Sequence, residues 1–264
     1  MDLFHPRPFC NFTTYYIQRV APERSNRMSE GTHDTVREIR HGDRDTLARH
    51  VAGSLAEALQ SSLQQRSHAS LIVPGGSTPV PVFRVLREQT LPWSRVRVSL
   101  SDERWVPPTS HDSNEHLVCR ELLQGKAAAA QLIGLTSTIE TPWLAVNDCA
   151  RRLAQLPRPF DAVLLGMGDD GHTASLFPGS DALVSGLDHE HGEDCVASHP
   201  EGIPQPRLSL GLHALLDSRL LILCFFGESK WQVYQEALTA DPMQMPVAAV
   251  LRQTRTPVTV HWAP

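Results

Sequence analysis

Apolar residues recur every four positions between about Asp45 and Arg66, which is the pattern of an amphipathic helix packed on a core. The next segment, 69–73, is a short continuous apolar run of the kind that a parallel sheet buries on both faces. This alternation of helical period and short apolar run continues along the chain. It predicts further strands at 95–100, 132–135, 162–165, 195–198, 207–210, 220–226 and 257–261, and further helices at 79–88, 113–124, 143–156, 228–240 and 247–252.

Strands that alternate with helices predict an α/β fold, a mostly parallel sheet with helices on both faces in a Rossmann-like arrangement. A chain of 264 residues can bury a full core as one domain, and we expect that domain at 34–264. Residues 1–33 mix aromatic, basic and proline residues without a helical or strand period, so we expect a disordered extension there. Because Met28 is a plausible alternative start, residues 1–27 could also reflect a misplaced translation start.

Composition limits the partners. The net charge is −5 and no run of Lys or Arg occurs, so nucleic acid and anionic membrane surfaces are unfavoured, and an anionic ligand must be held locally. The longest apolar stretch, 220–226, is too short to span a bilayer, and the N-terminus lacks a signal-peptide pattern. The five cysteines are scattered, odd in number and without a Cys-x-x-Cys pair, which fits a reducing cytoplasm. We therefore expect a cytoplasmic protein.

The first candidate chemistry follows the apolar run 162–165. Gly166, Gly168 and Gly171 free the backbone there, and His172 comes next, where we expect a helix to begin. Open α/β sheets bind ligands at the carboxyl ends of their strands. Since an imidazole exchanges protons near neutral pH, His172 is a candidate acid or base.

Other strand ends carry groups that suit an anion. The loop Pro74-Gly-Gly-Ser-Thr-Pro79 offers backbone amides and two hydroxyls, with Thr78 expected as helix N-cap and Pro79 as the first helical residue. A tight turn without a ligand would explain the same loop. Two carboxylates and a guanidinium, Asp102, Glu103 and Arg104, follow the strand at 95–100 and point to the same ligand edge, where a surface ion pair is the alternative. If these ends share one edge with Arg207 and Lys230, they form a pocket with an anion-binding side and one imidazole.

Three other readings of the motifs are disfavoured. The run 166–171 matches the dinucleotide fingerprint Gly-x-Gly-x-x-Gly, but Asp169 and Asp170 would place negative charge where a pyrophosphate must approach. His189 and His191 lie among acids in a spacing that matches no defined metal-ligand set. No Gly-x-Ser-x-Gly elbow occurs, which disfavours a serine hydrolase. Direct attack by water, with a histidine as base, remains as the acyl chemistry.

Six segments, in order over about residues 35–262, carry a family resemblance: 74–79, Ser-Asp-Glu-Arg-Trp-Val-Pro at 101–107, Ser-Asn-Glu at 113–115, Gly-Met-Gly-Asp-Asp-Gly-His-Thr-Ala-Ser-Leu-Phe-Pro-Gly at 166–179, Pro-Arg-Leu-Ser-Leu at 206–210, and Gly-Glu-Ser-Lys at 227–230. With them the sequence resembles the 6-phosphogluconolactonase family, whose fold is shared with glucosamine-6-phosphate isomerase/deaminase. The resemblance implies hydrolysis of 6-phospho-D-glucono-1,5-lactone to 6-phosphogluconate in the oxidative pentose phosphate pathway.

The resemblance also implies residue roles. His172 would be the general base, and Asp170 would orient its loop or its ring. The sugar phosphate would be held by the amides of the 75–78 loop and by basic side chains, the expected binding set being Gly75, Gly76, Ser77, Thr78, Asp102, Arg104, Arg207 and Lys230. No metal or organic cofactor is implied, and we expect a monomer or a weak homodimer.

Two alternatives stay open. The isomerase/deaminase branch carries Asp-Glu-Tyr where this chain has Asp102-Glu103-Arg104, and a carboxylate five residues after the motif histidine, where this chain has Phe177. A non-catalytic sugar-phosphate sensor is the second alternative. Such a regulator should carry a helix-turn-helix, and the first 40 residues show no periodic helical pair.

Overall fold

The computed structural model describes residues 36–264, so the expectations for residues 1–33 lie outside it. The strands are β1 Val36–Arg40, β2 Ala69–Val73, β3 Val96–Leu100, β4 Asp102–Arg104, β5 Gln131–Leu132, β6 Ala162–Leu165, β7 Cys195–Ser198, β8 Arg207–Leu210, β9 Leu221–Phe226 and β10 Val258–Ala263. The α-helices are α1 Arg44–Gln65, α2 Val80–Leu86, α3 Asn114–Glu121, α4 Pro142–Leu153, α5 Leu183–Leu187, α6 Leu212–Leu216, α7 Glu228–Ala237 and α8 Val247–Arg252, and 3₁₀ turns lie at Trp93–Arg95 and Gly125–Ala129.

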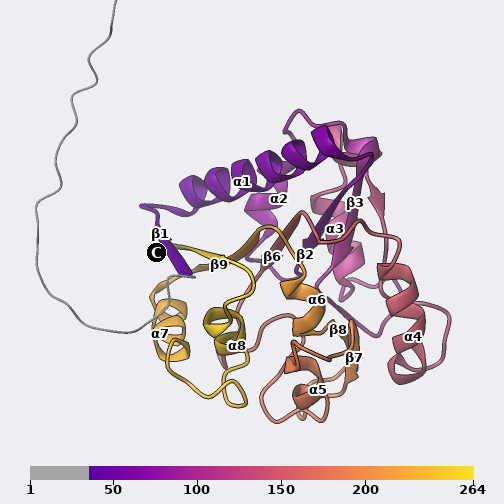
Figure 1. The fold of residues 1–264 in the computed structure, drawn as a ribbon, viewed down its shortest axis with the longest axis vertical. Coiled ribbons are helices and arrows are strands. Elements are labelled where there is room, and N and C mark those ends of the chain that lie inside the picture. The colour runs from indigo at the N-terminus through magenta and orange to yellow at the C-terminus, as the bar shows by residue number, and fades with distance from the viewer. Residues whose placement is uncertain (1–35) are drawn as a thin grey trace, which may run out of the picture. The chain divides into compact units, whose positions relative to one another are not determined.

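Seven strands form one sheet in the order β1-β10-β9-β6-β2-β3-β5, and every neighbouring pair in it is parallel. From β1 through β2 and β3 to β5 the chain moves toward one edge, and from β6 through β9 to β10 it moves back toward the other. Because parallel crossovers are right-handed, the two series place their helices on opposite faces. Figure 1 shows α1 and α2 on one side of the strands and α7 and α8 on the other. The predicted fold class is confirmed.

The continuous apolar runs of the sequence form the central strands of the sheet, where both faces are buried. Every residue of β2 and of β6 is buried, since both strands have covered faces on either side. The apolar residues that recur every four positions in α1 pack against α2 and the sheet. Leu47, Val51, Leu55 and Leu59 are fully buried. The strand expected at 132–135 is only the pair Gln131–Leu132, and β1 was not predicted.

A second, three-stranded antiparallel sheet, in the order β4-β8-β7, was not predicted as a separate sheet. Its strand β4 is three residues long and polar, so it carries no hydrophobic period. In register, Arg104 lies opposite Arg207 and Asp102 lies opposite Ser209. The polar segment that sequence analysis placed at a strand end is therefore itself a strand of another sheet.

Two expected helix starts are wrong. No helix begins at His172: the chain turns, Thr173 and Leu176 form a short bridge, and the next helix is α5. The local polar groups are satisfied by other partners, because Thr173 Oγ1 donates to Gly166 O and Gly171 O accepts from Val247 N. Helix α2 starts at Val80 with no side-chain cap, so Thr78 is not its N-cap. Ser113 does cap α3, as expected.

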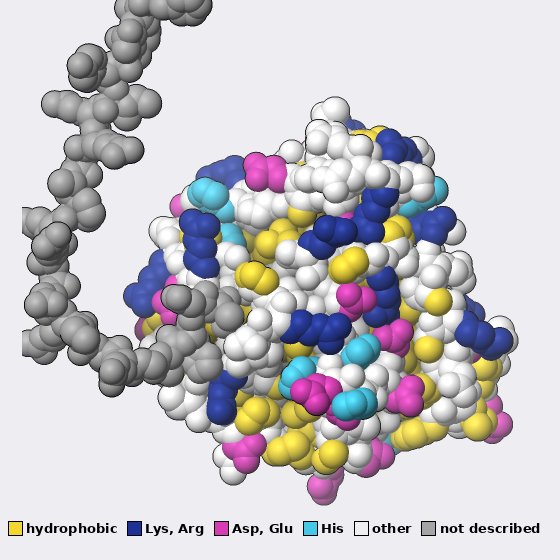
Figure 2. Space-filling model, viewed as in Figure 1, with side chains coloured by type: hydrophobic (Ala, Val, Ile, Leu, Met, Phe, Trp, Pro, Cys, Tyr) yellow, Lys and Arg dark blue, Asp and Glu magenta, His cyan; other side chains and the backbone are white. Residues whose placement is uncertain are grey.

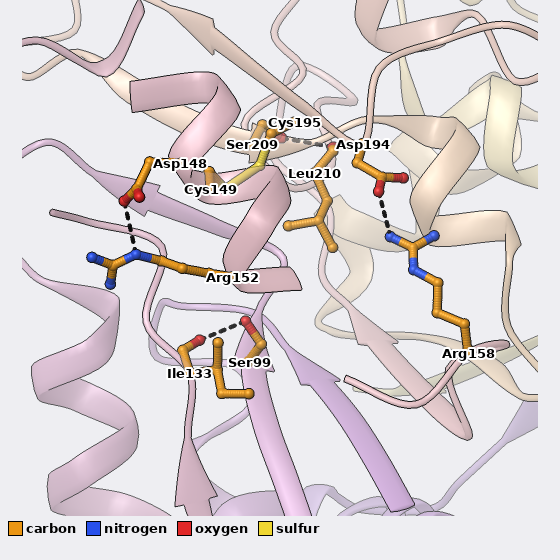
Figure 3. The surroundings of a disulfide bond; sticks show 10 residues. All are labelled: Ser99, Ile133, Asp148, Cys149, Arg152, Arg158, Asp194, Cys195, Ser209 and Leu210. Carbon is orange, nitrogen blue, oxygen red and sulfur yellow. Dashed lines mark hydrogen bonds and ion pairs between the residues drawn. A yellow bond between two sulfur atoms is a disulfide. The ribbon is translucent and has the colours of Figure 1, made fainter. Parts of the chain in front are cut away.

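A disulfide joins Cys149 of α4 to Cys195 of β7, with Cα atoms 6.6 Å apart (Figure 3). It ties the helix to the three-stranded sheet. This pairing was not predicted, because the two residues are 46 positions apart and belong to no spacing motif. Cys119 and Cys224 are free, and the reducing location expected from the scattered cysteines stays a prediction.

The surface mixes charges of both signs. On the face drawn in Figure 2, basic and acidic side chains are interspersed and do not form one basic field. Within residues 36–264, no helix combines the length and apolar character that crossing a membrane requires.

Candidate active site

The two central strands β2 and β6 lie side by side, and their connections leave toward opposite faces of the sheet. Such a switch point opens a crevice at the carboxyl edge, where doubly wound sheets bind ligands. A cavity of about 470 Å³ lies there. Its walls include every predicted site residue except Asp170, namely Gly75, Gly76, Ser77, Thr78, Asp102, Arg104, His172, Arg207 and Lys230.

His172 belongs to a tight turn after β6. Its Nδ1 lies 2.5 Å from Asp170 Oδ1, and its backbone amide donates to the same oxygen at 3.1 Å. Burial opposes ionisation of Asp170, but the hydrogen bonds and charge of His172 outweigh it and lower the pKa of the carboxyl. A Cβ at Gly168 would lie 2.0 Å from His172 Nδ1, so the turn requires glycine there. Asp170 therefore fixes one ring nitrogen from behind the cavity wall.

The loop after β2 presents unpaired backbone donors. Among the described residues, the amides of Gly75, Gly76, Ser77 and Thr78 donate to no protein acceptor. Gly76 adopts φ +83°, a left-handed conformation that favours glycine. Successive free amides in such a loop form a concave donor set suited to an anion.

Arg104 and Arg207 are cross-strand partners in the small sheet, and both line the cavity. Like charges placed directly opposite destabilise a sheet, so an anion between them would relieve their repulsion. Burial, followed by the charge of Arg104, lowers the pKa of Arg207. Its Nε is buried without a hydrogen-bond partner within the described part of the chain. Arg104 donates to Asp112 O at 2.6 Å, which holds its guanidinium at the cavity rim.

Lys230 and Asp102 complete the polar wall. Lys230 Nζ donates to Met167 O at 2.8 Å and pairs with Asp169 at 2.9 Å, which ties the start of α7 to the turn after β6. Asp102 accepts hydrogen bonds from Ser101 Oγ and from Ser175 Oγ, the latter at 2.6 Å. Since Ser175 follows the His172 turn, this bond connects the histidine side of the cavity to the small sheet.

Sequence reasoning missed or misplaced three residues near these groups, since it expected Glu103 at the ligand edge beside Asp102 and gave no role to the other two. Asn114 lines the cavity and is 2% exposed. Glu103 lies fully buried behind it, and burial raises the pKa of its carboxyl to about 7. Phe177 also lines the cavity, with its ring centroid 4.1 Å from that of His172. The signal available for the first two was their place inside the quoted segments 101–107 and 113–115.

The cavity does not fit a dinucleotide. The fingerprint requires a helix directly after the glycine turn, but the turn at 166–172 is followed by a bridge, and the Gly168 amide donates to His172 O. Within residues 36–264, no three His, Cys, Asp or Glu side chains gather closely enough to hold a metal ion. The polar lining of the cavity consists of one imidazole, three cations, one carboxylate and a row of amides, together with hydroxyl and amide side chains.

Fold and cavity define the class: a doubly wound α/β protein with a basic, small-molecule-sized pocket at the switch point of its sheet. The chain belongs to the family of glucosamine-6-phosphate isomerases/6-phosphogluconolactonase, whose model matches residues 42–262.

Several relatives are similar over most of their length. The chain is 42% identical to a 6-phosphogluconolactonase of Pseudomonas aeruginosa over 218 residues, which are 82% of this chain and 90% of the relative. It is 40% identical to the enzyme of that name from Rhizobium meliloti, over 83% of this chain and 94% of the relative. The crystal structure of a 6-phosphogluconolactonase from Shewanella baltica superposes with a TM-score of 0.85 at 40% identity, covering 89% of this chain and all of that one.

Proposed function

We propose that this chain is a lactonase that hydrolyses 6-phospho-D-glucono-1,5-lactone to 6-phosphogluconate, the second step of the oxidative pentose phosphate pathway. The carrying observation is the cavity at the switch point, whose lining includes His172 together with Arg104, Arg207 and Lys230. Its relatives at about 40% identity bear the lactonase name. A neutral sugar ring with one phosphate needs such a division between a basic end and a proton-transfer end.

In the proposed reaction, His172 removes a proton from water through Nε2 while the water oxygen bonds to the lactone carbonyl carbon. The ring carbon–oxygen bond then breaks, and the imidazolium returns the proton to the leaving ring oxygen. Water is thus added across the ester, and histidine is regenerated. Asp170 holds Nδ1–H and so presents Nε2 as the basic nitrogen.

The phosphate is assigned to Arg104, Arg207 and Lys230 with the amides of residues 75–78, and Asp102 faces the sugar. Fixing the phosphate places the carbonyl near His172, and orientation supplies much of the acceleration. No metal or organic cofactor takes part in this scheme. We assign the whole site to one domain, residues 34–264, and expect a chain truncated before residue 34 to keep its activity.

The isomerase/deaminase branch is the second candidate, and Phe177 argues against it. An aromatic ring lies 4.1 Å from the ring of His172 in the sequence position where that branch carries a carboxylate. A phenyl ring cannot relay a proton. Lactone hydrolysis by the purified protein would exclude the alternative of a non-catalytic sugar-phosphate sensor.

A coupled assay tests the proposal. Glucose-6-phosphate dehydrogenase generates fresh lactone, and 6-phosphogluconate formation is compared with and without the protein, because the lactone also opens spontaneously. Acceleration that is lost in His172→Ala supports the lactonase. Release of ammonia from glucosamine 6-phosphate without lactone hydrolysis would instead support the deaminase.

We also propose a cytoplasmic monomer or weak homodimer without a nucleic-acid partner. The mixed surface charge and the net charge of −5 support the absence of nucleic acid. Because disulfides are uncommon in reducing cytosol, the redox state of Cys149 and Cys195 in the cell tests the proposed location. Thiol trapping in fresh cell extract and cell fractionation test the location, and analytical ultracentrifugation with and without nucleic acid tests the oligomeric state and the absence of a nucleic-acid partner.

A further inference from the structure

Glu103 stands between two cavity residues without lining the cavity itself. Asp102 and Arg104 flank it in β4 and both line the cavity. Because side chains alternate along a strand, Glu103 points the other way, and it is 0% exposed. A carboxylate buried this completely needs several hydrogen bonds.

All four bonds to Glu103 come from within two short segments. Oε1 accepts from the backbone amides of Arg104 at 2.7 Å and Asn114 at 2.8 Å. Oε2 accepts from the amide of Glu115 at 2.8 Å and from Ser113 Oγ at 3.0 Å. Two of these donors are first-turn amides of α3, which have no partner within the helix. Glu103 thus fastens the start of α3 to β4.

Asn114 extends this connection to the third wall of the cavity. Its Nδ2 donates to Asp102 O at 2.9 Å. A Cβ added to Gly75 would lie 1.9 Å from Asn114 Oδ1, so the side-chain amide packs directly on the loop after β2. Through Asn114, one carboxylate therefore fixes β4, α3 and the loop of free amides relative to one another.

The start of α3 also has a side-chain cap of its own. Ser113 already caps α3 by accepting from His116 N. Burial raises the pKa of Glu103 to about 7 in spite of its four hydrogen bonds, so the ionised group costs stability. A buried charge that is retained at such a cost points to geometry as its purpose.

We propose that Glu103 is a positioning residue, which holds Arg104 and Asn114 in the arrangement that binds the phosphate of the substrate. The inference rests on the proposed lactonase function. It assigns Glu103 no contact with the substrate and no part in proton transfer. It predicts an effect on phosphate binding that is separate from the chemical step.

The test is Glu103→Gln, which keeps the volume but turns one acceptor oxygen into an amide group facing other donors. We expect KM for the lactone and the dissociation constant of inorganic phosphate to rise together by about tenfold, as loss of one charged hydrogen bond implies. We expect kcat to stay within about threefold. Melting temperatures are recorded so that every variant is assayed while folded.

Glu121→Gln is the matched control. Glu121 lies at the other end of the same helix, is 8% exposed, and binds Arg84 and Arg120 instead of cavity residues. We expect both constants to change by less than about twofold in this variant. An equal rise in Glu121→Gln would overturn the inference, because helix destabilisation alone would then explain the effect.

Two further results would overturn the inference: unchanged KM and phosphate affinity in Glu103→Gln, or a fall in kcat with phosphate affinity unchanged. If Glu103→Gln does not fold, Asn114→Ala replaces it and must raise both constants in the same way. If the wild-type protein shows no lactonase activity, the proposed function fails. Phosphate binding, measured by calorimetry, still tests the positioning role in that case.

Discussion

The two sheets build opposite walls of the cavity by different means. The parallel sheet contributes its connections: the amides of residues 75–78, His172 and Lys230 all lie just beyond strand ends. The antiparallel sheet contributes strand residues, since Asp102, Arg104 and Arg207 project from β4 and β8 themselves. In the parallel sheet, the turns of the backbone after the strands position the cavity residues. In the antiparallel sheet, the cross-strand register positions them.

This difference separates two kinds of effect under the proposed function. Chemistry depends on a histidine held in a turn of the parallel sheet, whereas phosphate affinity depends on two arginines brought together by the antiparallel sheet. Variants of His172 should therefore change kcat, whereas variants of the phosphate ligands, on either wall, should change KM.

The largest effect is expected for His172→Ala. Removing the base should lower kcat by about 10³-fold, within the range of general base catalysis, and leave phosphate affinity nearly intact. The coupled assay gives kcat, and calorimetry with inorganic phosphate gives the affinity. His68→Ala, at a half-buried position that does not line the cavity, is the control. Full activity in His172→Ala would remove the base assignment.

Arg207→Gln should have the next largest effect, and this effect should be on KM more than on kcat. Loss of a largely buried cation that faces the phosphate should raise KM by about 10- to 100-fold, with a smaller change in kcat. Arg104→Gln should act in the same direction but more weakly, because Arg104 is more exposed. Arg120→Gln, on the surface of α3, is the control. A loss confined to kcat would contradict the separation between the two walls.

Most of the parallel sheet could be predicted from the sequence, and so could strands β7 and β8, but β4 and the pairing of these three strands into a separate sheet could not. Strands buried on both faces, such as β2 and β6, are continuous apolar runs that stand out in any window. Strand β4 is three polar residues, and it exists because it pairs with a segment about a hundred positions away. No local pattern encodes such a pairing.

The same difference separates the site residues that could be predicted from those that could not. Residues just after apolar strands, such as His172 and Gly75, were found because the strand ends were visible in the sequence. Asn114 received no role and Glu103 was wrongly expected at the ligand edge, because their contacts arise only where β4 meets α3. The disulfide escaped prediction for the same reason, since helix α4 and β7 meet only in the folded chain.

Gly75→Ala tests the junction between the two walls. The new Cβ would lie 1.9 Å from Asn114 Oδ1, so either the loop or the side-chain amide must move. We expect KM to rise by about fivefold with little change in kcat, as shifted phosphate ligands imply. Gly53→Ala is the control, because nothing lies within 4 Å of a Cβ there.

The double variant Gly75→Ala with Asn114→Ala sharpens this test. Truncating Asn114 removes the clash, so part of the effect of Gly75→Ala should disappear in the double variant. Additive effects of the two substitutions would instead mean that the loop and α3 act on the phosphate independently. The two walls would then not be coupled through Asn114.

The smallest expected effect is on stability. The change of the free energy of unfolding with pH should have opposite sign for a buried group in each of the two sheets. In the parallel sheet, His261 is 2% exposed with Nδ1 3.0 Å from His41 Nε2. Burial, then the charges of His41, His50 and Arg37, lowers the pKa of His261 from 6.5 to about 4. The unfolded chain therefore binds the proton first, and stability is lost as pH falls from about 6.5 to 4.

Glu103 in the antiparallel sheet has the reverse linkage. Its pKa is raised by burial from 4.5 to about 7, so the folded protein binds the proton first, and stability is lost as pH rises through that interval. Each group should contribute on the order of 2 kcal/mol to the free energy of unfolding. Urea unfolding across this pH range should show a flatter acid limb in His261→Gln and a more positive slope in Glu103→Gln, relative to wild type. If both variants changed the slope of stability against pH in the same direction, the prediction would be wrong. The lowered pKa of His261 and the raised pKa of Glu103 require changes of opposite sign.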